Sequence, residues 1–243
     1  MTKILLIGFL FSVLSRGVAP VAVFSPVFLD DQIVFATIVA TDPPYNADPT
    51  GQVDATAAIN QAMLDVQRKG GGTCFLPAGF YRCEGGLVLR GKVTLQGEWQ
   101  PPVPGEALRG TVLMAYPGRG DPDGDPFMRG PSSGHAHLKS MAIWYPEQTT
   151  DPIVPYPYTI ELGVAHVRQI TLVNSYRGIH MSVNSGSVVS DIYGTVLEMG
   201  IWTQNCGEFA RLHKVRFSPD YWCTMQLPGE EPPVGAENVL LAM

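Results

Sequence analysis

Residues 48–95 read DPTGQVDATAAINQAMLDVQRKGGGTCFLPAGFYRCEGGLVLRGKVTL. The first half of this stretch has the apolar spacing of one helix, and we predict a helix over about residues 55–69. Asp54 stands at the expected N-cap, and the glycines after Lys69 end the helix. The apolar stripe consists of Ala55, Ala58, Ile59, Ala62, Met63 and Val66.

After the glycines the apolar period changes from that of a helix to that of a strand. Cys74 and Leu76 face one side, Thr73 and Phe75 the other, and Tyr81 and Cys83 return to the first side after a Pro-Ala-Gly turn. Runs of four or five residues separated by corners favour coiled short strands over long hairpins.

Residues 36–100 resemble the start of the rhamnogalacturonase/epimerase-like pectate lyase domain. The resemblance rests on the amphipathic helix, on GGGTCFLPAGFYR and on LVLRGKVTLQGE. It implies a single-stranded right-handed parallel β-helix whose first coil is capped by the helix, of which this chain is the N-terminal part. The family usually opens with Gly-Ala-x-Gly-Asp-Gly and paired aspartates, whereas here YNADPTG occupies that place and Asp54 alone stands for the pair. No catalytic residue follows from the resemblance.

The length and composition fit one large all-β domain. The chain has 243 residues, with 26 glycines, 21 prolines and only 16% charged residues, which suits many tight corners. Its formal net charge of -6 argues against nucleic acid as a partner. An acidic polysaccharide would need a local basic patch or a bridging cation.

The N-terminus is typical of a signal peptide. Lys3 precedes an apolar run too short to span a bilayer, and small residues at 17–19 offer a cleavage site. We predict a signal peptide over residues 1–19, a secreted or cell-envelope location and a β-helix domain over 36–243. An uncleaved membrane anchor is the alternative, because apolar residues resume at Val21.

The remaining motifs give no strong metal or redox signal. Cys74, Cys83 and Cys223 fall at inward positions, so a Cys74–Cys83 disulfide is an option without being implied, and zinc spacing is absent. The alternating Asp121, Asp123 and Asp125 resemble part of a calcium loop but lack its glutamate. His135 and His137 alternate onto one face with no third ligand near them in the sequence. We therefore predict no metal site or cofactor, with calcium as an open alternative.

Repeats from residue 138 onward predict the architecture. Ile143, Ile170, Ile192 and Val215 begin similar strands at intervals of about 22 to 27 residues, one coil of a β-helix. A second inward column contains Tyr145, Leu172, Gly194 and Phe217, and a third contains Ile179, Ile201 and Cys223. The outward columns contain Trp144, Thr171, Tyr193 and Arg216, and His180, Trp202 and Thr224. A β-sandwich is the alternative, but Asn-Gly hairpin turns are missing.

The same register predicts a site. A corner column would contain Tyr176, Glu198 and Asp220, which places two carboxylates one coil apart. Close carboxylates raise one another's pKa, so Glu198 and Asp220 are the candidate acid and base or nucleophile. Tyr176, His180 and Trp202 are the candidate substrate-binding residues. The alternative is that these carboxylates are solvated corner residues.

Two function classes follow. The first is a secreted glycoside hydrolase or polysaccharide lyase acting on a pectin-like or other polysaccharide. The second is a non-catalytic glycan-binding or structural module, or a fragment without its active site. Residues 237–243 read ENVLLAM, like the start of another strand without a cap, so we expect pairing of this open end with further sequence or another chain.

Overall fold

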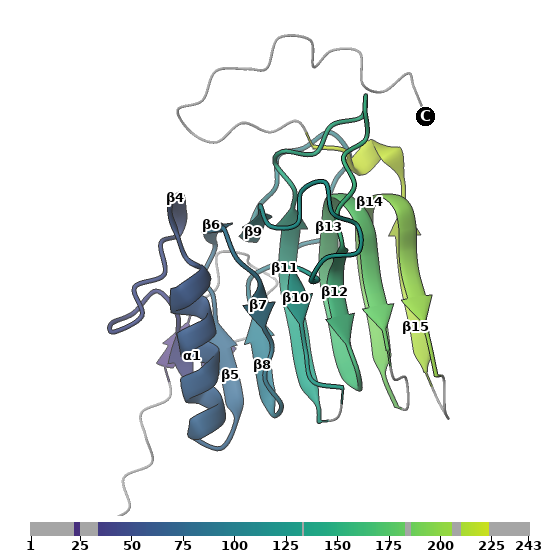
Figure 1. Ribbon diagram of the computed structural model, residues 1–243. Helices are drawn as coiled ribbons and strands as arrows, with labels where there is room; N and C mark the ends of the chain where they lie inside the picture. Colours follow the sequence, from purple (N-terminus) through teal and green to yellow (C-terminus); the bar gives the residue numbers. More distant parts are fainter. Residues whose placement is uncertain (1–21, 25–33, 133, 183–185, 206–209, 224–243) are drawn as a thin grey trace, which may run out of the picture.

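The fold is a parallel β-helix, as predicted, with one α-helix across its first coil (Figure 1). The computed structural model describes residues 22–24, 34–132, 134–182, 186–205 and 210–223. The predicted signal peptide and the predicted open end at 237–243 lie outside these residues. Among the described residues, no helix is long and apolar enough to cross a membrane.

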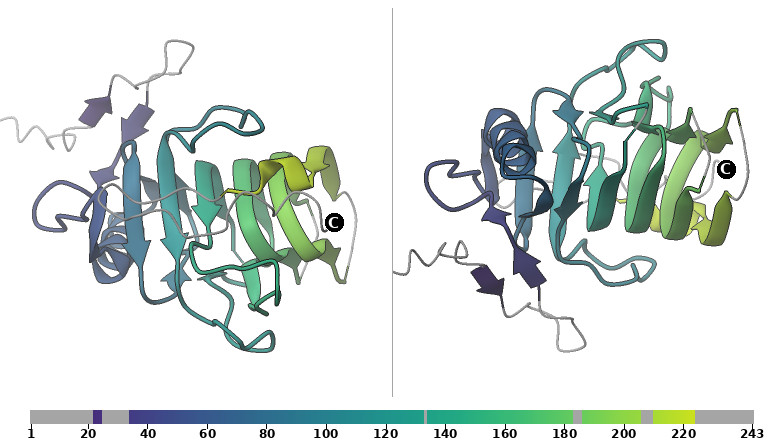
Figure 2. Two further views of the ribbon diagram at one scale, coloured as in Figure 1. Left: turned by 90° about the horizontal axis from the view of Figure 1, so that it is seen from above. Right: turned by 90° about the horizontal axis from the view of Figure 1, so that it is seen from below.

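Three parallel sheets form the walls of the coil, and their strands lie side by side along the axis (Figure 2). The first sheet contains β3 (Ile38–Val39), β5 (Gly72–Phe75), β8 (Val93–Gln96) and the first parts of β11 (Ala136–Trp144), β13 (Ala165–Met181), β14 (Val188–Thr203) and β15 (Arg211–Phe217). The second contains β4 (Thr50–Asp54), β6 (Gly79–Cys83), β9 (Thr111–Ala115) and the following parts of β11, β13, β14 and β15. The third contains β7 (Leu87–Val88), β10 (Met128–Arg129), β12 (Tyr158–Leu162) and the last parts of β13 and β14.

The long strands pass from the first sheet to the second through single residues with left-handed backbone. Ser140, Gln169, Asp191 and Lys214 have φ values of 63°, 56°, 57° and 53°. Each follows a residue in one register column, Lys139–Arg168–Ser190–His213, so the four corners stack on one another. Asn174, with φ 57°, makes the next corner of β13.

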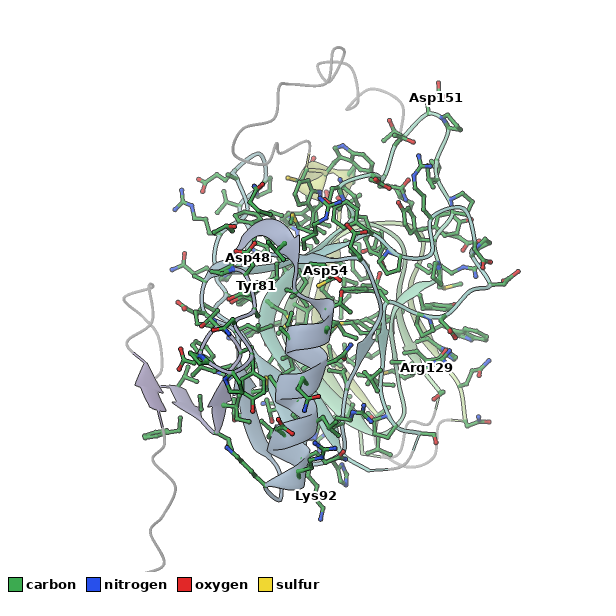
Figure 3. All side chains as sticks on the ribbon, turned by 60° about the vertical axis from the view of Figure 1, so that its left-hand side comes forward. Asp48, Asp54, Tyr81, Lys92, Arg129 and Asp151 are labelled. Atoms are coloured by element: carbon green, nitrogen blue, oxygen red, sulfur yellow. The ribbon has the colours of Figure 1, made fainter. Side chains whose placement is uncertain are left out.

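Helix α1 (Thr56–Arg68) closes the first coil, and Figure 3 shows it from that side. Its buried residues are Ile59, Ala62, Met63 and Val66, which belong to the predicted stripe and pack into the core of the coil. The N-cap is Ala55, not Asp54 as predicted, and no side chain caps it. The Asp54 carboxylate instead accepts hydrogen bonds from the Thr56 amide at 3.0 Å and the Glu84 amide at 3.1 Å, which ties the helix start to the next coil.

The predicted register is correct in the later coils and wrong by two residues in one. Ile170, Ile192 and Val215 pair as predicted, as do Leu172, Gly194 and Phe217. Ile143, however, pairs with Leu172, and Trp144 pairs with Val173. The register in this coil could not be read from the repeat spacing, because the proline-rich insert after Tyr145 changes the number of residues in the coil.

From Ser218 onward the described chain no longer follows the predicted register columns. After β15 the 3-10 helix η1 (Pro219–Tyr221) turns the chain, and Cys223 hydrogen-bonds the Asn174 side chain through both its backbone amide (3.0 Å) and its carbonyl (2.7 Å). Cys223 therefore does not continue the Ile179–Ile201 column. Cys74 and Cys83 are free and buried, so the optional disulfide is absent, and burial raises the pKa of Cys74 to about 12. A short antiparallel pair, β1 (Ala22–Phe24) and β2 (Val34–Ala36), precedes the coil.

Candidate functional site

Three aromatic side chains stack on the outward face of the third sheet, and we call them the aromatic shelf: Tyr158, His180 and Trp202. They come from β12, β13 and β14, where His180 pairs in register with Trp202. Ile179 and Ile201 pack on the core, so strand alternation turns His180 and Trp202 outward, whereas Tyr158 faces outward because β12 departs from strict alternation at the two successive buried residues Thr159 and Ile160. The His180 and Trp202 rings lie 4.5 Å apart at 15°, and Tyr158 lies 5.1 Å from His180 and 5.9 Å from Trp202.

Trp202 is the outermost ring of the shelf. Its residue is 40% exposed, whereas His180 is 8% exposed. In the described part of the chain β15 pairs only with residues of β14 up to Gly194, so no strand continues the third sheet past Trp202. An exposed indole held flat by a stacked neighbour suits stacking against the apolar face of a sugar ring.

Arg177 and Glu198 form an ion pair beside the shelf. The Arg177 Nε donates to Glu198, and its Nη1 donates to the Pro122 carbonyl at 2.9 Å. The same guanidinium lies 3.7 Å from Asp123 and 5.6 Å from the ring centres of Tyr158 and Tyr176. Arg177 thus joins the loop at 122–123, the shelf and Glu198.

This environment keeps Glu198 ionised. Hydrogen bonding from Arg177, aided by its charge and by Tyr176, lowers the pKa of Glu198 below its ordinary value. A carboxylate with a lowered pKa can accept hydrogen bonds or act as a base, but it is a poor proton donor at neutral pH.

A second acid–base pair lies under the shelf. Glu161 Oε2 is 3.0 Å from His180 Nδ1, and Arg129 Nε lies 3.8 Å from Glu161. The other ring nitrogen of His180, Nε2, is buried without a hydrogen-bond partner in the described residues. Arg129 stands out at the side of the coil in Figure 3. The contact with Glu161 therefore holds the imidazole by Nδ1, and Nε2 is the ring nitrogen that has no partner in the described residues.

Asp220 does not join Glu198. It lies in η1, where its carboxylate accepts from the Ser218 hydroxyl at 2.8 Å. It lines a small pocket over the outward face of the second sheet, with Pro102, Leu108, Thr171 and Tyr221. The two predicted catalytic carboxylates therefore have separate partners on two faces, because the chain turns at Ser218 and leaves the repeat. Tyr176, Glu198, His180 and Trp202 do gather around the shelf.

The aspartates of the 121–125 loop do not converge on one point. Asp121 caps the Asp123 amide at 3.3 Å, Asp123 faces Arg177, and Asp125 pairs with Arg129 at 2.8 Å. No group of three or more His, Cys, Asp or Glu in the described residues could hold a metal ion.

The predicted histidine pair has a third member. His166 of β13 lies 4.8 Å from His137 between ring centres, and its amide donates to His137 Nδ1 at 3.3 Å. This neighbour is 29 residues away in sequence, so only the coil register brings it close to His137.

Sequence reasoning missed several members of the site: Arg129, Tyr158, Glu161 and Arg177. The composition of YTIEL at 158–162 was an available signal for a strand, but strict alternation would put Tyr158 and Glu161 on opposite faces, so the sequence did not predict that both lie outward. The prolines that precede Tyr158 led us to assign this segment to the end of a proline-rich insert and not to a strand.

Comparisons with known proteins give one family match and two remote structural similarities. Residues 43–117 match the family model described as "Rhamnogalacturonase A/epimerase, pectate lyase-like", which confirms the resemblance of the first coils. No curated protein sequence matches the chain. A crystal structure described as a "putative glycosyl hydrolase" from Parabacteroides merdae ATCC 43184 is similar at 15% identity and a TM-score of 0.49, covering 77% of this chain and 99% of that one. The A-module of the mannuronan C-5 epimerase AlgE4 from Azotobacter vinelandii is similar at 16% identity and a TM-score of 0.49, covering 74% of this chain and 50% of that one.

Proposed function

We propose that this protein is a carbohydrate-active β-helix that holds a polysaccharide chain against the aromatic shelf. The observation that carries the proposal is the exposed Trp202 ring stacked on His180 beside the Arg177–Glu198 pair. Sugar sites in proteins combine an aromatic ring for the apolar face of a sugar with charged hydrogen-bonding groups for its hydroxyls. The match of residues 43–117 supports a carbohydrate as the ligand.

Binding is the primary activity that this geometry supports. Glu198 is paired with Arg177, Glu161 with His180 and Arg129, and Asp220 lies elsewhere, so both glutamates next to the shelf are already held by basic partners. A hydrolase needs a second carboxyl group that can donate a proton at a defined separation. A hydrolase or lyase acting on a pectin-like chain remains the second candidate, favoured by the family match.

Replacing Trp202 with alanine is expected to weaken glycan binding about tenfold, because one stacking ring contributes roughly 1.4 kcal/mol. Affinity electrophoresis of the full chain in gels containing pectin, polygalacturonate, xylan or dextran would measure this. Trp222→Ala is the matched control, since Trp222 lines the pocket over the second sheet. Equal mobility of wild type and Trp202→Ala in every gel would refute the shelf as the binding surface. Reducing ends or unsaturated uronides released in the same mixtures would identify the enzyme alternative.

We also propose that the protein is exported, on the basis of Lys3 and the apolar run that follows it. Expression with the native N-terminus should then give protein outside the cytoplasm whose first residue lies just after position 19. N-terminal sequencing of that fraction is the measurement. A product that stays in the cytoplasmic fraction with Met1 intact would contradict export.

A further inference from the structure

The outward face of the first sheet carries cations, and its described register columns contain no acid. Two register columns run along it, and alternation turns both away from the core because Leu138, Val167 and Val189 between them are buried. One column contains Thr73, Thr94, His137, His166, Val188 and Arg211, and the other contains Phe75, Gln96, Lys139, Arg168, Ser190 and His213. We call Lys139, Arg168 and Arg211 with His137, His166 and His213 the basic face.

The three permanent cations of the basic face have no carboxylate partner in the described part of the chain. Among the described residues, no carboxylate lies within ion-pair distance of the three permanent cations of this face. Elsewhere in the described residues most arginines do pair with a carboxylate: Arg68, Arg82, Arg109, Arg119, Arg129 and Arg177. The described cations outside the basic face that lack a carboxylate partner are scattered singly or in sequence-separate places, at Lys69, Arg90, Lys92 and Arg216.

Lys139 and Arg168 are direct cross-strand neighbours. Like charges directly opposite each other on adjacent strands repel and destabilise a sheet. An external anion that lies along both side chains would relieve this repulsion. The strand spacing of about 4.8 Å sets the distance between successive positions along the column.

We propose that the basic face is a second binding surface, which takes a linear polyanionic glycan lying along the axis of the coil. Such a chain presents a carboxylate or sulfate at regular intervals, which can meet Lys139 and Arg168 on adjacent strands and then His213 further along. This is the local basic patch that an acidic polysaccharide requires on a chain of net charge -6. The choice of a glycan rests on the proposed function, whereas the surface itself is separate from the aromatic shelf.

Other polyanions fit the face less well. Single-stranded nucleic acid uses aromatic platforms for its bases, and Phe75, the one Phe, Tyr or Trp in these two columns, is buried. Duplex nucleic acid has a dense phosphate charge, for which proteins use many cations and a basic overall charge. An anionic membrane surface calls for exposed apolar anchors on the same face as the cations, whereas the exposed Leu212 beside Arg211 pairs with the buried Val189 in the inward column.

The histidines should make the binding depend on pH. Burial and the neighbouring cationic groups lower the pKa of both His137 and His166 below the ordinary value. The titratable groups next to His137 and His166 come from three strands and the residues before them. They are Lys139 in β11 and His135 just before it, Arg168 in β13, and Lys92 just before β8. All of these are basic, so both imidazoles are neutral at pH 7 and gain charge only as the pH falls. Binding of a fully ionised polyanion should therefore tighten in acid.

The test uses the full chain with Lys139→Gln and Arg168→Gln together, against polygalacturonate, dextran sulfate and neutral dextran in isothermal titration at low salt. We expect wild type to bind one or both anionic polymers, and the variant to bind about tenfold more weakly with a shallower dependence on salt. The two polymers separate carboxylate from sulfate recognition. Lys69→Gln with Arg109→Gln removes the same charge elsewhere and should leave the affinity unchanged.

Binding to dextran sulfate should also tighten from pH 7 to pH 5, and His137→Gln with His166→Gln should flatten that change. Equal affinity of wild type and the Lys139/Arg168 variant, or an equal loss in the Lys69/Arg109 control, would overturn the proposal. If wild type bound single-stranded DNA as tightly as the anionic glycans, and the Lys139/Arg168 variant lost that binding, the assignment of a glycan as the ligand would be overturned. Trp202→Ala in the same assay separates the two proposed surfaces. If the aromatic shelf does not bind glycans, Trp202→Ala keeps the wild-type affinity while the Lys139/Arg168 variant still loses it.

Discussion

Replacing Gly194 with alanine is expected to destabilise the protein by about 3 kcal/mol or more. Gly194 lies in the second sheet between Leu172 and Phe217, with φ 140°, a backbone conformation that side chains rarely adopt. A Cβ at this position would overlap the Leu172 carbonyl oxygen. The neighbour is backbone, so it cannot move aside without breaking the strand pairing.

Chemical denaturation of Gly194→Ala and Gly91→Ala measures this effect against a matched control. Gly91 has no left-handed φ, and a Cβ there would meet nothing within 4 Å. The control should stay within about 0.5 kcal/mol of wild type. Similar midpoints for the two variants would show that the coils at Leu172 and Gly194 are not packed as closely as described.

Replacing Arg177 with methionine is expected to weaken glycan binding about a hundredfold and to cost about 2 kcal/mol of stability. The side chain is 22% exposed and hydrogen-bonds both Glu198 and the Pro122 carbonyl. Its loss leaves Glu198 and Asp123 without their shared cation and frees the loop beside the shelf. The expected loss exceeds that of Trp202→Ala because both the charge and the geometry of the site change.

The stability difference should also depend on pH. The pKa of Glu198 is lowered in the folded protein, so its stabilising effect is fully present above the ordinary value of 4.5 and disappears as the pH falls through the folded pKa. The difference between the thermal melts of wild type and Arg177→Met should therefore shrink as the pH falls below 4.5, leaving the part due to the Pro122 hydrogen bond. Arg119→Met is the control, since Arg119 is 53% exposed and its pairing with Glu147 at 3.5 Å should contribute under about 1 kcal/mol. A pH-independent difference would show that Arg177 acts through packing and the Pro122 hydrogen bond and not through Glu198.

The fold could be read from the sequence because its signals are local and periodic. The stripe of α1 and the recurrence of Ile170, Ile192 and Val215 depend only on spacing, and the structure confirms both. Strand alternation then turned His180 and Trp202 outward next to each other, also as predicted.

The site could be read only in part because its remaining members come from irregular segments. Asp123 approaches Arg177 from a loop, and Tyr158 follows a proline-rich insert. Asp220 was assigned to a repeat that the chain leaves at Ser218. No local pattern reports how far a loop or an insert displaces the residues after it, so these contacts require the folded coil.

The stacked single-residue corners also constrain how such a chain can change during evolution. Ser140, Gln169, Asp191 and Lys214 fix the join between the first and second sheets to one residue in each of four coils. A residue inserted at one corner would shift that coil out of register with the coils on either side, whereas the segment between β11 and β12 already holds a long proline-rich excursion. Length variation among descendants of this sequence should therefore accumulate where the second sheet gives way to the third, beside the aromatic shelf, and new ligand specificities could arise there without disturbing the basic face.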